Sequence, residues 1–204
     1  MTTSENKEIE AKFYLTDLEA YKHRLEIEGA HLVQSKIHEY NLSFDTPNFA
    51  LLHKDCILRL RKDTVTKLTY KGTSDLSSGV TVRQEIEIIV DSFDNARLFL
   101  ESLGYCIHWV YEKYRTTYTH KNLMITIDET PIGIFTEIEG ENTEEIRKNA
   151  ERLGLTWSNR ILSNYLADFL RVQNSLQLPF RDMTFENFKN IIVVASDLGV
   201  VPAD

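Results

Sequence analysis

The stretch Glu8-Ile9-Glu10-Ala11-Lys12 decides the fold, because charged and apolar residues alternate along it. In a β-strand, side chains two residues apart lie on the same face. The two glutamates and the lysine would therefore line one face of a strand, and the apolar residues would line the other. Alone, this pattern is typical of any half-buried strand, so its recurrence along the chain carries the information.

The triplet Glu-Ile-Glu returns at 85–87 and at 137–139, and each copy begins a similar series of elements. Residues that commonly cap helices follow, then apolar residues at helical spacing, and then a glycine. We expect helices that end near Gly29, Gly104 and Gly154, the first with a capping box at residues 16–19. A further copy at 26–28 falls inside the first predicted helix. The triplet alone is therefore not informative, and the prediction rests on the series of cap, helix and glycine that follows it.

The composition indicates a globular protein with a substantial core. The chain has 204 residues, of which 42% are hydrophobic and 26% charged. No apolar run approaches the ~18 residues that span a bilayer, and residues 1–7 lack a secretory apolar segment, so we expect a cytoplasmic protein without membrane contact. The net charge of −8 argues against nucleic-acid binding, which usually needs a basic surface. A small anionic ligand stays compatible with it.

Further alternating stretches predict about eight strands, largely antiparallel because their connections are short. After the first, they lie at 31–45, 56–62, 67–72, 82–88, 111–117, 124–128 and 135–139. A fourth helix is expected at 159–172. We expect one or two more helices in the remaining residues, which divides the chain into a domain at 1–172 and a C-terminal helical extension at 173–204.

Histidine and cysteine offer no metal centre. Cys56 and Cys106 form neither a disulfide framework nor a cluster. The histidines show no ligand spacing, so we expect them on the surface or in loops. They are His23, His31, His38, His53, His108 and His120.

Nearly every predicted strand carries charge at alternate positions. The in-phase acids are Glu8, Glu10, Glu85, Glu87, Asp128, Glu137 and Glu139. The in-phase bases are Lys12, Arg59, Arg61, Lys67, Lys71, Arg83, Lys113 and Arg115. In one interpretation the charged faces meet water, as in most antiparallel sheets. In the other, the strands close into a barrel with the charges inside and the helices packed on an apolar outside.

Two features favour the closed barrel: the amphipathic helices need an apolar sheet face, and the acids and bases are nearly balanced. The crowding of charge then predicts the ligand. Like charges 4 Å apart repel by about 4 kcal/mol at an effective dielectric constant near 20, so the glutamates require a cation. Carboxylate oxygens without histidine or cysteine select Mg²⁺ or Mn²⁺. The bases require a multiply charged anion such as a polyphosphate.

The chain resembles the CYTH domain, or triphosphate tunnel metalloenzyme, family. Glu8-x-Glu10-x-Lys12 is similar to its ExExK signature. The likeness continues, in the right order, through residues 44–47, 58–61, 68–72, 83–87, 112–115, 128 and 137–140. The family includes class IV adenylyl cyclases, thiamine triphosphatases and inorganic triphosphatases. The resemblance implies an α+β fold, an eight-stranded antiparallel tunnel with a charged interior, and it favours the closed barrel.

The resemblance also implies roles for individual residues. The metal ligands would be Glu8, Glu10, Asp128, Glu137 and Glu139. The phosphate-binding residues would be Lys12, Arg59, Arg61, Lys71, Arg83, Lys113 and Arg115. Lys12, Glu85 and Glu87 would take part in catalysis, the two acids by holding a second metal, orienting the bases or activating water.

Two positions depart from the family's patterns. Ser43 and Phe44 stand where thiamine triphosphatases carry an aromatic pair whose first member assists catalysis. In Ser163-Asn164-Tyr165 the basic residue that often precedes Ser-Tyr in the family is missing, so either Arg160 or no residue takes its role. We expect Tyr165 to pack between helix and barrel rather than to cap the tunnel.

The leading functional prediction is a metal-dependent hydrolase of a triphosphate, most simply inorganic tripolyphosphate, in a monomer or homodimer. The first alternative is a class IV adenylyl cyclase that makes cyclic AMP and pyrophosphate from ATP. The second is a non-catalytic polyphosphate or nucleotide-binding module that uses residues from Gln173 onward to bind a partner.

Overall fold

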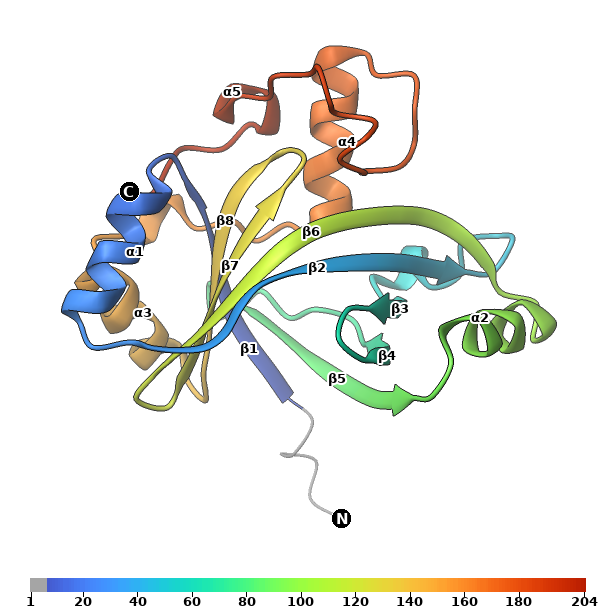
Figure 1. Ribbon diagram of the computed structural model, residues 1–204, viewed down its shortest axis with the longest axis horizontal. Coiled ribbons are helices and arrows are strands. Elements are labelled where there is room, and N and C mark those ends of the chain that lie inside the picture. Colours follow the sequence, from blue (N-terminus) through green and yellow to red (C-terminus); the bar gives the residue numbers. More distant parts are fainter. Residues whose placement is uncertain (1–6) are drawn as a thin grey trace.

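Eight antiparallel strands close into a ring in the computed structural model, which describes residues 7–204 (Figure 1). Their order around the ring is β1-β5-β4-β3-β2-β6-β7-β8. The strands are β1 (Lys7–Leu15), β2 (His31–Asp45), β3 (Ile57–Lys62), β4 (Thr66–Lys71), β5 (Thr81–Val90), β6 (Cys106–His120), β7 (Leu123–Thr130) and β8 (Gly133–Glu139). The α+β, eight-stranded barrel prediction is confirmed. Residues 1–6, which include the start of the predicted domain at 1–172 and most of the stretch examined for a secretory segment, lie outside the described residues.

The alternation along β1 sorts its side chains between the inside and the outside of the ring. Ile9, Ala11 and Phe13 are buried in an outer core, where they meet the helices α1 (Leu18–Ile27) and α3 (Thr143–Arg152). Figure 1 shows these two helices on the same side of the ring. A sheet whose outer face is apolar needs such a cover, because burying that face is the main favourable term in folding. The charged set of β1 is left to face inward.

The predicted ends of three helices are confirmed. Gly29, Gly104 and Gly154 follow α1, α2 (Phe93–Ser102) and α3, with φ of 77°, 90° and 75°. A residue with a side chain pays a steric cost in this left-handed conformation, whereas glycine does not. The helix α1 is capped by the side chain of Asp17 rather than by Thr16, because Asp17 accepts from the N–H of Ala20. No helix among residues 7–204 is long and apolar enough to cross a membrane.

The C-terminal part differs from the predicted helices. The helix α4 (Tyr165–Leu176) begins later than residue 159, because Ile161 pairs with β1 through its N–H and the carbonyl of Lys12, 2.7 Å apart. Beyond α4 the described chain contains only the short helix α5 (Ala195–Leu198), and residues 185–190 form turns. The sequence pattern there reflects packing on the ring and not helical periodicity.

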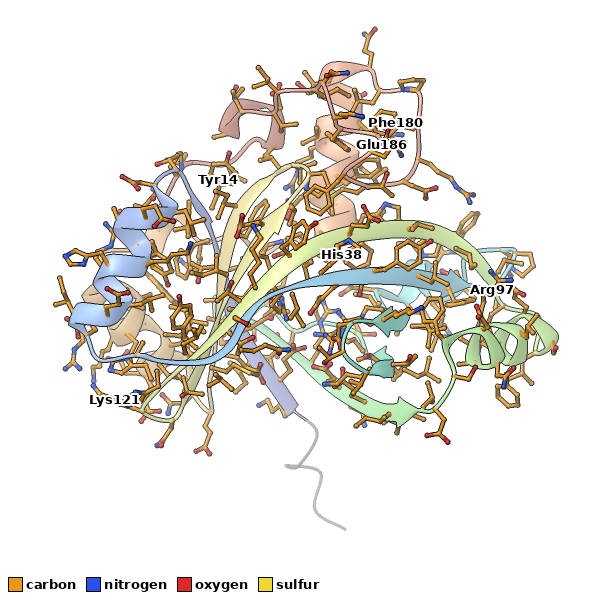
Figure 2. All side chains as sticks on the ribbon, in the orientation of Figure 1. Tyr14, His38, Arg97, Lys121, Phe180 and Glu186 are labelled. Atoms are coloured by element: carbon orange, nitrogen blue, oxygen red, sulfur yellow. The ribbon has the colours of Figure 1, made fainter. Side chains whose placement is uncertain are left out.

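The residues from 177 to 204, called the tail below, lie against α4 and β6. The side chain of Gln173 donates to the carbonyl of Phe180 at 2.6 Å, and Met183 pairs in parallel with Tyr111 of β6. Phe180 and Glu186 lie in this tail beside α4 (Figure 2). Further along, the N–H of Ala203 donates to the carbonyl of Tyr14 at 3.0 Å. The tail is thus part of the same packed unit as the ring.

We expect Phe188→Ala to lower the free energy of unfolding by about 3 kcal/mol or more, as for other buried aromatic side chains. Phe188 is 5% exposed and its ring contacts those of Phe169 and Phe180. The matched control is Ile192→Ala in the same tail, where the side chain is 85% exposed and the expected change is below about 0.5 kcal/mol. Equal, small losses in a urea unfolding experiment would show that the tail is dispensable for stability.

Candidate functional site

The ring encloses a cavity of about 600 Å³. Almost all of the predicted site residues contribute to its wall, so the charged interior is confirmed and the solvated-sheet interpretation is wrong. The residues that line it are Glu8, Glu10, Lys12, Arg59, Arg61, Lys71, Arg83, Glu85, Glu87, Lys113, Arg115, Glu137 and Glu139. Asp128 lies directly behind this wall, fully buried.

One side of the cavity is acidic, because β1 and β8 bring their glutamates together. Glu10 pairs opposite Glu139 across the two antiparallel strands, an arrangement that holds Cβ atoms about 5 Å apart. Burial, together with the charges of Glu137 and Glu8, raises the pKa of Glu10 to about 8. Burial and the neighbouring acids raise the pKa of Glu139 to about 7. These carboxyl groups lack sufficient positive charge nearby.

Lys71 partly compensates the other acids of this side. Its Nζ donates to both carboxylate oxygens of Glu8 at 2.6 Å and lies 3.3 Å from Glu85. Burial acts to raise the pKa of Glu8, but Lys71 outweighs it and holds this pKa below its usual value. The pKa of Glu85 is raised, mainly by burial, despite Lys71. One lysine therefore compensates one of the two acids.

Asp128 of β7, the strand next to β8, organises the bases of β6. Its carboxylate accepts from Lys113 Nζ at 2.8 Å, from Arg115 Nε at 2.6 Å and from the hydroxyl of Tyr165 at 2.8 Å. Arg115 also lies 2.6 Å from Glu137. Although burial acts to raise the pKa of Asp128, these cations lower it strongly. In this arrangement Asp128 fixes the bases, and its predicted role as a metal ligand stays a prediction.

Glu39 belongs to the same network, although the sequence analysis did not select it. It is 2% exposed and lies 3.6 Å from both Lys113 and Arg61. The alternation of Glu39, Asn41, Ser43 and Asp45 with apolar residues was the signal for it, because it continues the inward phase along β2.

The third group lies on β3, β4 and β5. Lys67 pairs with Glu87 at 2.6 Å, and Glu87 also lies 3.8 Å from a guanidinium nitrogen of Arg59 and of Arg61. Burial acts to raise the pKa of Glu87, but these cations lower it. Glu87 is therefore a stable carboxylate that orients the bases around it.

Several guanidinium groups of the wall keep unused donors. The Nε and Nη1 atoms of Arg83 and the Nε atom of Arg59 are buried without a hydrogen-bond partner among residues 7–204. A buried donor without a partner costs about 1–3 kcal/mol, and more when it is charged. Such donors indicate a place where a ligand with acceptor oxygens completes the bonding.

Lys12 is held differently from the other bases. Its Nζ lies 2.6 Å from the buried carboxylate of Asp168 on α4 and 2.5 Å from the carbonyl of Ser163. It also lies 4.4 Å from the ring centre of Tyr165. The sequence analysis missed Asp168, because only the fold brings α4 onto β1.

The structure corrects the expectation for two histidines and decides two questions that the sequence left open. His108 lines the cavity and His120 is 6% exposed, so neither is a surface or loop residue. Tyr165 contacts Asp128 and lines the cavity as well as packing on Phe135. Arg160 does not supply a cavity base, because its guanidinium binds the carbonyls of Gly79 and Trp157 instead.

The acidic side fits Mg²⁺ or Mn²⁺ by its chemistry. It offers carboxylate oxygens only, and two of its acids have raised pKa values that a cation would lower. Among the described residues, no three potential ligands converge closely enough to hold an ion as they stand. Mg²⁺ is commonly held by one or two carboxylates together with water and substrate phosphates, so Glu10 and Glu139 would hold it jointly with a bound phosphate.

Residues 6–161 match the family model of the CYTH domain, and the chain belongs to this family. No curated protein matches it.

Several solved structures share the fold. A protein from Pyrococcus horikoshii is 27% identical, with a TM-score of 0.66 over 78% of this chain and 96% of that one. A candidate adenylate cyclase from Vibrio parahaemolyticus is 19% identical, with a TM-score of 0.70 over 78% and 95%. A candidate adenylyl cyclase from Hippeastrum, described as having a dominant triphosphatase activity, is 21% identical, with a TM-score of 0.55 over 71% and 84%.

We expect the free energy of unfolding of the metal-free protein to fall as the pH rises from 5 to 8. The folded pKa values of Glu10 and Glu139, about 8 and about 7, lie above their ordinary value of 4.5. In this range the folded state keeps protons that the unfolded state has lost, so stability decreases with pH and levels off above the folded pKa. Urea unfolding at successive pH values measures the slope.

Glu10→Gln should flatten this slope, and Mg²⁺ or Mn²⁺ should stabilise the wild-type protein more at pH 8 than at pH 6. Glu144→Gln on the exposed face of α3 is the control, since its side chain is 67% exposed. An unchanged slope in Glu10→Gln would show that Glu10 is not a source of the pH dependence of stability.

Proposed function

We propose that this protein is a divalent-metal-dependent triphosphatase, which hydrolyses inorganic tripolyphosphate or a related small triphosphate inside the ring. One observation carries the proposal. The same enclosed cavity holds buried arginine donors without partners and buried glutamates without sufficient positive charge. A polyphosphate accompanied by a divalent metal supplies what both sets lack.

The size and charge of the cavity support a small anion. About 600 Å³ lies within the range of small-molecule sites. The bases stand on β3, β4, β5 and β6 around this space, so they can contact several phosphates of one molecule. Planar guanidinium groups match phosphate oxygens in pairs, and lysines add point charges. Nucleic acid and membrane are not among the proposed partners, and a cytoplasmic location remains a prediction.

The division of labour follows from the pairing in the wall. Arg59, Arg61 and Arg83 would bind the phosphate chain with their unused donors. Lys113 and Arg115, oriented by Asp128, would add charge from β6. Such preorganised donors stabilise the charge that develops during phosphoryl transfer.

The acidic side would hold the metal. Glu10 and Glu139 are the best placed ligands, since Glu8 is occupied by Lys71. When bound, Mg²⁺ or Mn²⁺ supplies Lewis-acid neutralisation of phosphate oxygens. Glu8, Glu137 and Asp128 are the other predicted ligands, of which Asp128 already accepts from Lys113 and Arg115.

Of the two predicted catalytic glutamates, Glu85 is better suited to accept a proton from the attacking water. Its pKa is raised above the ordinary value, whereas that of Glu87 is lowered. A base works best when its pKa lies near the working pH. Glu87 would orient Arg59 and Arg61, and Lys12, paired with Asp168, would hold α4 against the cavity wall.

We expect phosphate release from tripolyphosphate when the protein is incubated with Mg²⁺ or Mn²⁺. Parallel reactions with ATP and thiamine triphosphate, with all products identified by chromatography, test the alternatives. Cyclic AMP with pyrophosphate would identify an adenylyl cyclase. Tight binding without turnover under every metal would identify a binding module.

We expect Arg83→Ala to reduce kcat/KM by about 100-fold, the scale of losing one preorganised donor. Its free energy of unfolding should fall modestly, because the substitution removes a cation that lies 3.8 Å from Asp55, so urea unfolding must show that the assayed variant is folded. Arg147→Ala on α3 is the matched control, since Arg147 is 52% exposed and pairs only with Glu151 in its helix. Near-normal turnover by folded Arg83→Ala would remove Arg83 from the site.

A further inference from the structure

The strand β6 carries an extra residue at His108. Ser43 of β2 pairs with Trp109, but the next residue, Phe44, pairs with Ile107, so His108 is left over between them. Such a β-bulge re-aims side chains, because the pleat shifts by one position. Ile107 consequently points outward to the core around Phe44, and His108 lines the cavity. Simple alternation would have placed these two residues the other way round.

A hydrogen bond holds the imidazole in this place. His108 Nε2 lies 3.1 Å from the hydroxyl of Ser43, which is 6% exposed and also lines the cavity. The loop that follows β2 is fixed by Asp45, whose carboxylate accepts from the N–H groups of Leu51 and Leu52. Phe49 of this loop packs edge-on against the imidazole. The histidine is therefore built into the wall.

The pair adjoins an arginine of the proposed phosphate site. Ser43 stands directly opposite Arg59 in the β2–β3 register, and the Nε of Arg59 has no hydrogen-bond partner among residues 7–204. Residues opposite each other in antiparallel strands project on the same face, here toward the cavity. A phosphate bound by Arg59 would thus reach Ser43 and His108 as well.

We propose that Ser43 and His108 form a further phosphate-binding element of the cavity, which binds the end of the triphosphate held by Arg59 and takes up a proton as it does so. The proposal rests on the proposed function. It adds a group whose charge is created by the ligand, in contrast to the permanently charged arginines.

The surroundings of the imidazole explain the proton uptake. Burial, and Arg181 of the tail, lower the pKa of His108, and the charge of Asp45 only partly offsets them. The imidazole is therefore mainly neutral near pH 7. An anion placed beside it favours the charged form and raises the pKa. By linkage, the triphosphate binds more tightly at pH values where that proton is available.

The test uses the whole chain, Mg²⁺ and an imido-bridged analogue of tripolyphosphate, because tripolyphosphate itself would be hydrolysed during the titration and would exchange protons as it reacts. NMR titration of the imidazole signals gives the pKa of His108 with and without the ligand, and we expect it to rise by about one unit on binding. Calorimetric titrations in buffers of different ionisation enthalpy then count the protons exchanged. His108→Gln should lose the uptake and bind about tenfold more weakly, the scale of a hydrogen bond to a charged group.

Ser43→Ala should weaken binding in the same direction, and His31→Gln, on an exposed part of β2, should change neither quantity. If His108→Gln does not fold, the wild-type NMR titration and Ser43→Ala decide. Tight binding with an unshifted His108 would overturn the inference and leave the proposed function intact. If the wild-type protein binds no triphosphate at all, both are overturned.

Discussion

The structure depends on the mutual compensation of charges inside a closed ring. A carboxylate or guanidinium removed from water loses several kcal/mol of hydration, which only partners in good geometry restore. Asp128 meets this condition, with Lys113, Arg115 and Tyr165 around one carboxylate. Glu10 and Glu139 do not, and their raised pKa values record the deficit. The uncompensated groups lower the stability of the ligand-free protein, and the same groups would favour the binding of a ligand that compensates them.

The uncompensated acids and the unused arginine donors lie on different strands around the cavity. Within residues 7–204, carboxyl groups without sufficient compensating charge collect where β1 and β8 meet, whereas the unused donors belong to arginines of β3 and β5. A neutral ligand would leave both deficits in place, and a simple anion would correct only one. The proposed ligand, a polyphosphate with a divalent metal, would bring charges of both signs and so correct both deficits.

Two sequence patterns predicted most of the fold, the alternation of charged and apolar residues in the strands and the glycines that follow the helices. The alternation of Glu8, Glu10 and Lys12 with apolar neighbours placed the charges on one face of the sheet, and the resemblance to the CYTH family favoured the closed barrel that turns this face inward. Gly29 and Gly104 marked helix ends that the structure confirms.

Other features depended on contacts between distant segments, which no local pattern reveals. Asp168 reaches Lys12 only after α4 folds back on β1, and the tail follows the surface of β6 in place of its own periodicity. His108 faces the cavity only because a bulge breaks the alternation on which the sequence analysis relied.

If the ring binds a phosphate as proposed, the contact between Lys12 and Asp168 would couple α4 to that ligand. The ammonium group carries one positive charge, which Asp168 and an incoming phosphate would share. Any ligand that draws on Lys12 weakens its hold on α4, and any displacement of α4 returns the full charge of Lys12 to the ligand, because coupling between two equilibria acts equally in both directions. The position of α4 would therefore depend on whether the ring holds a ligand.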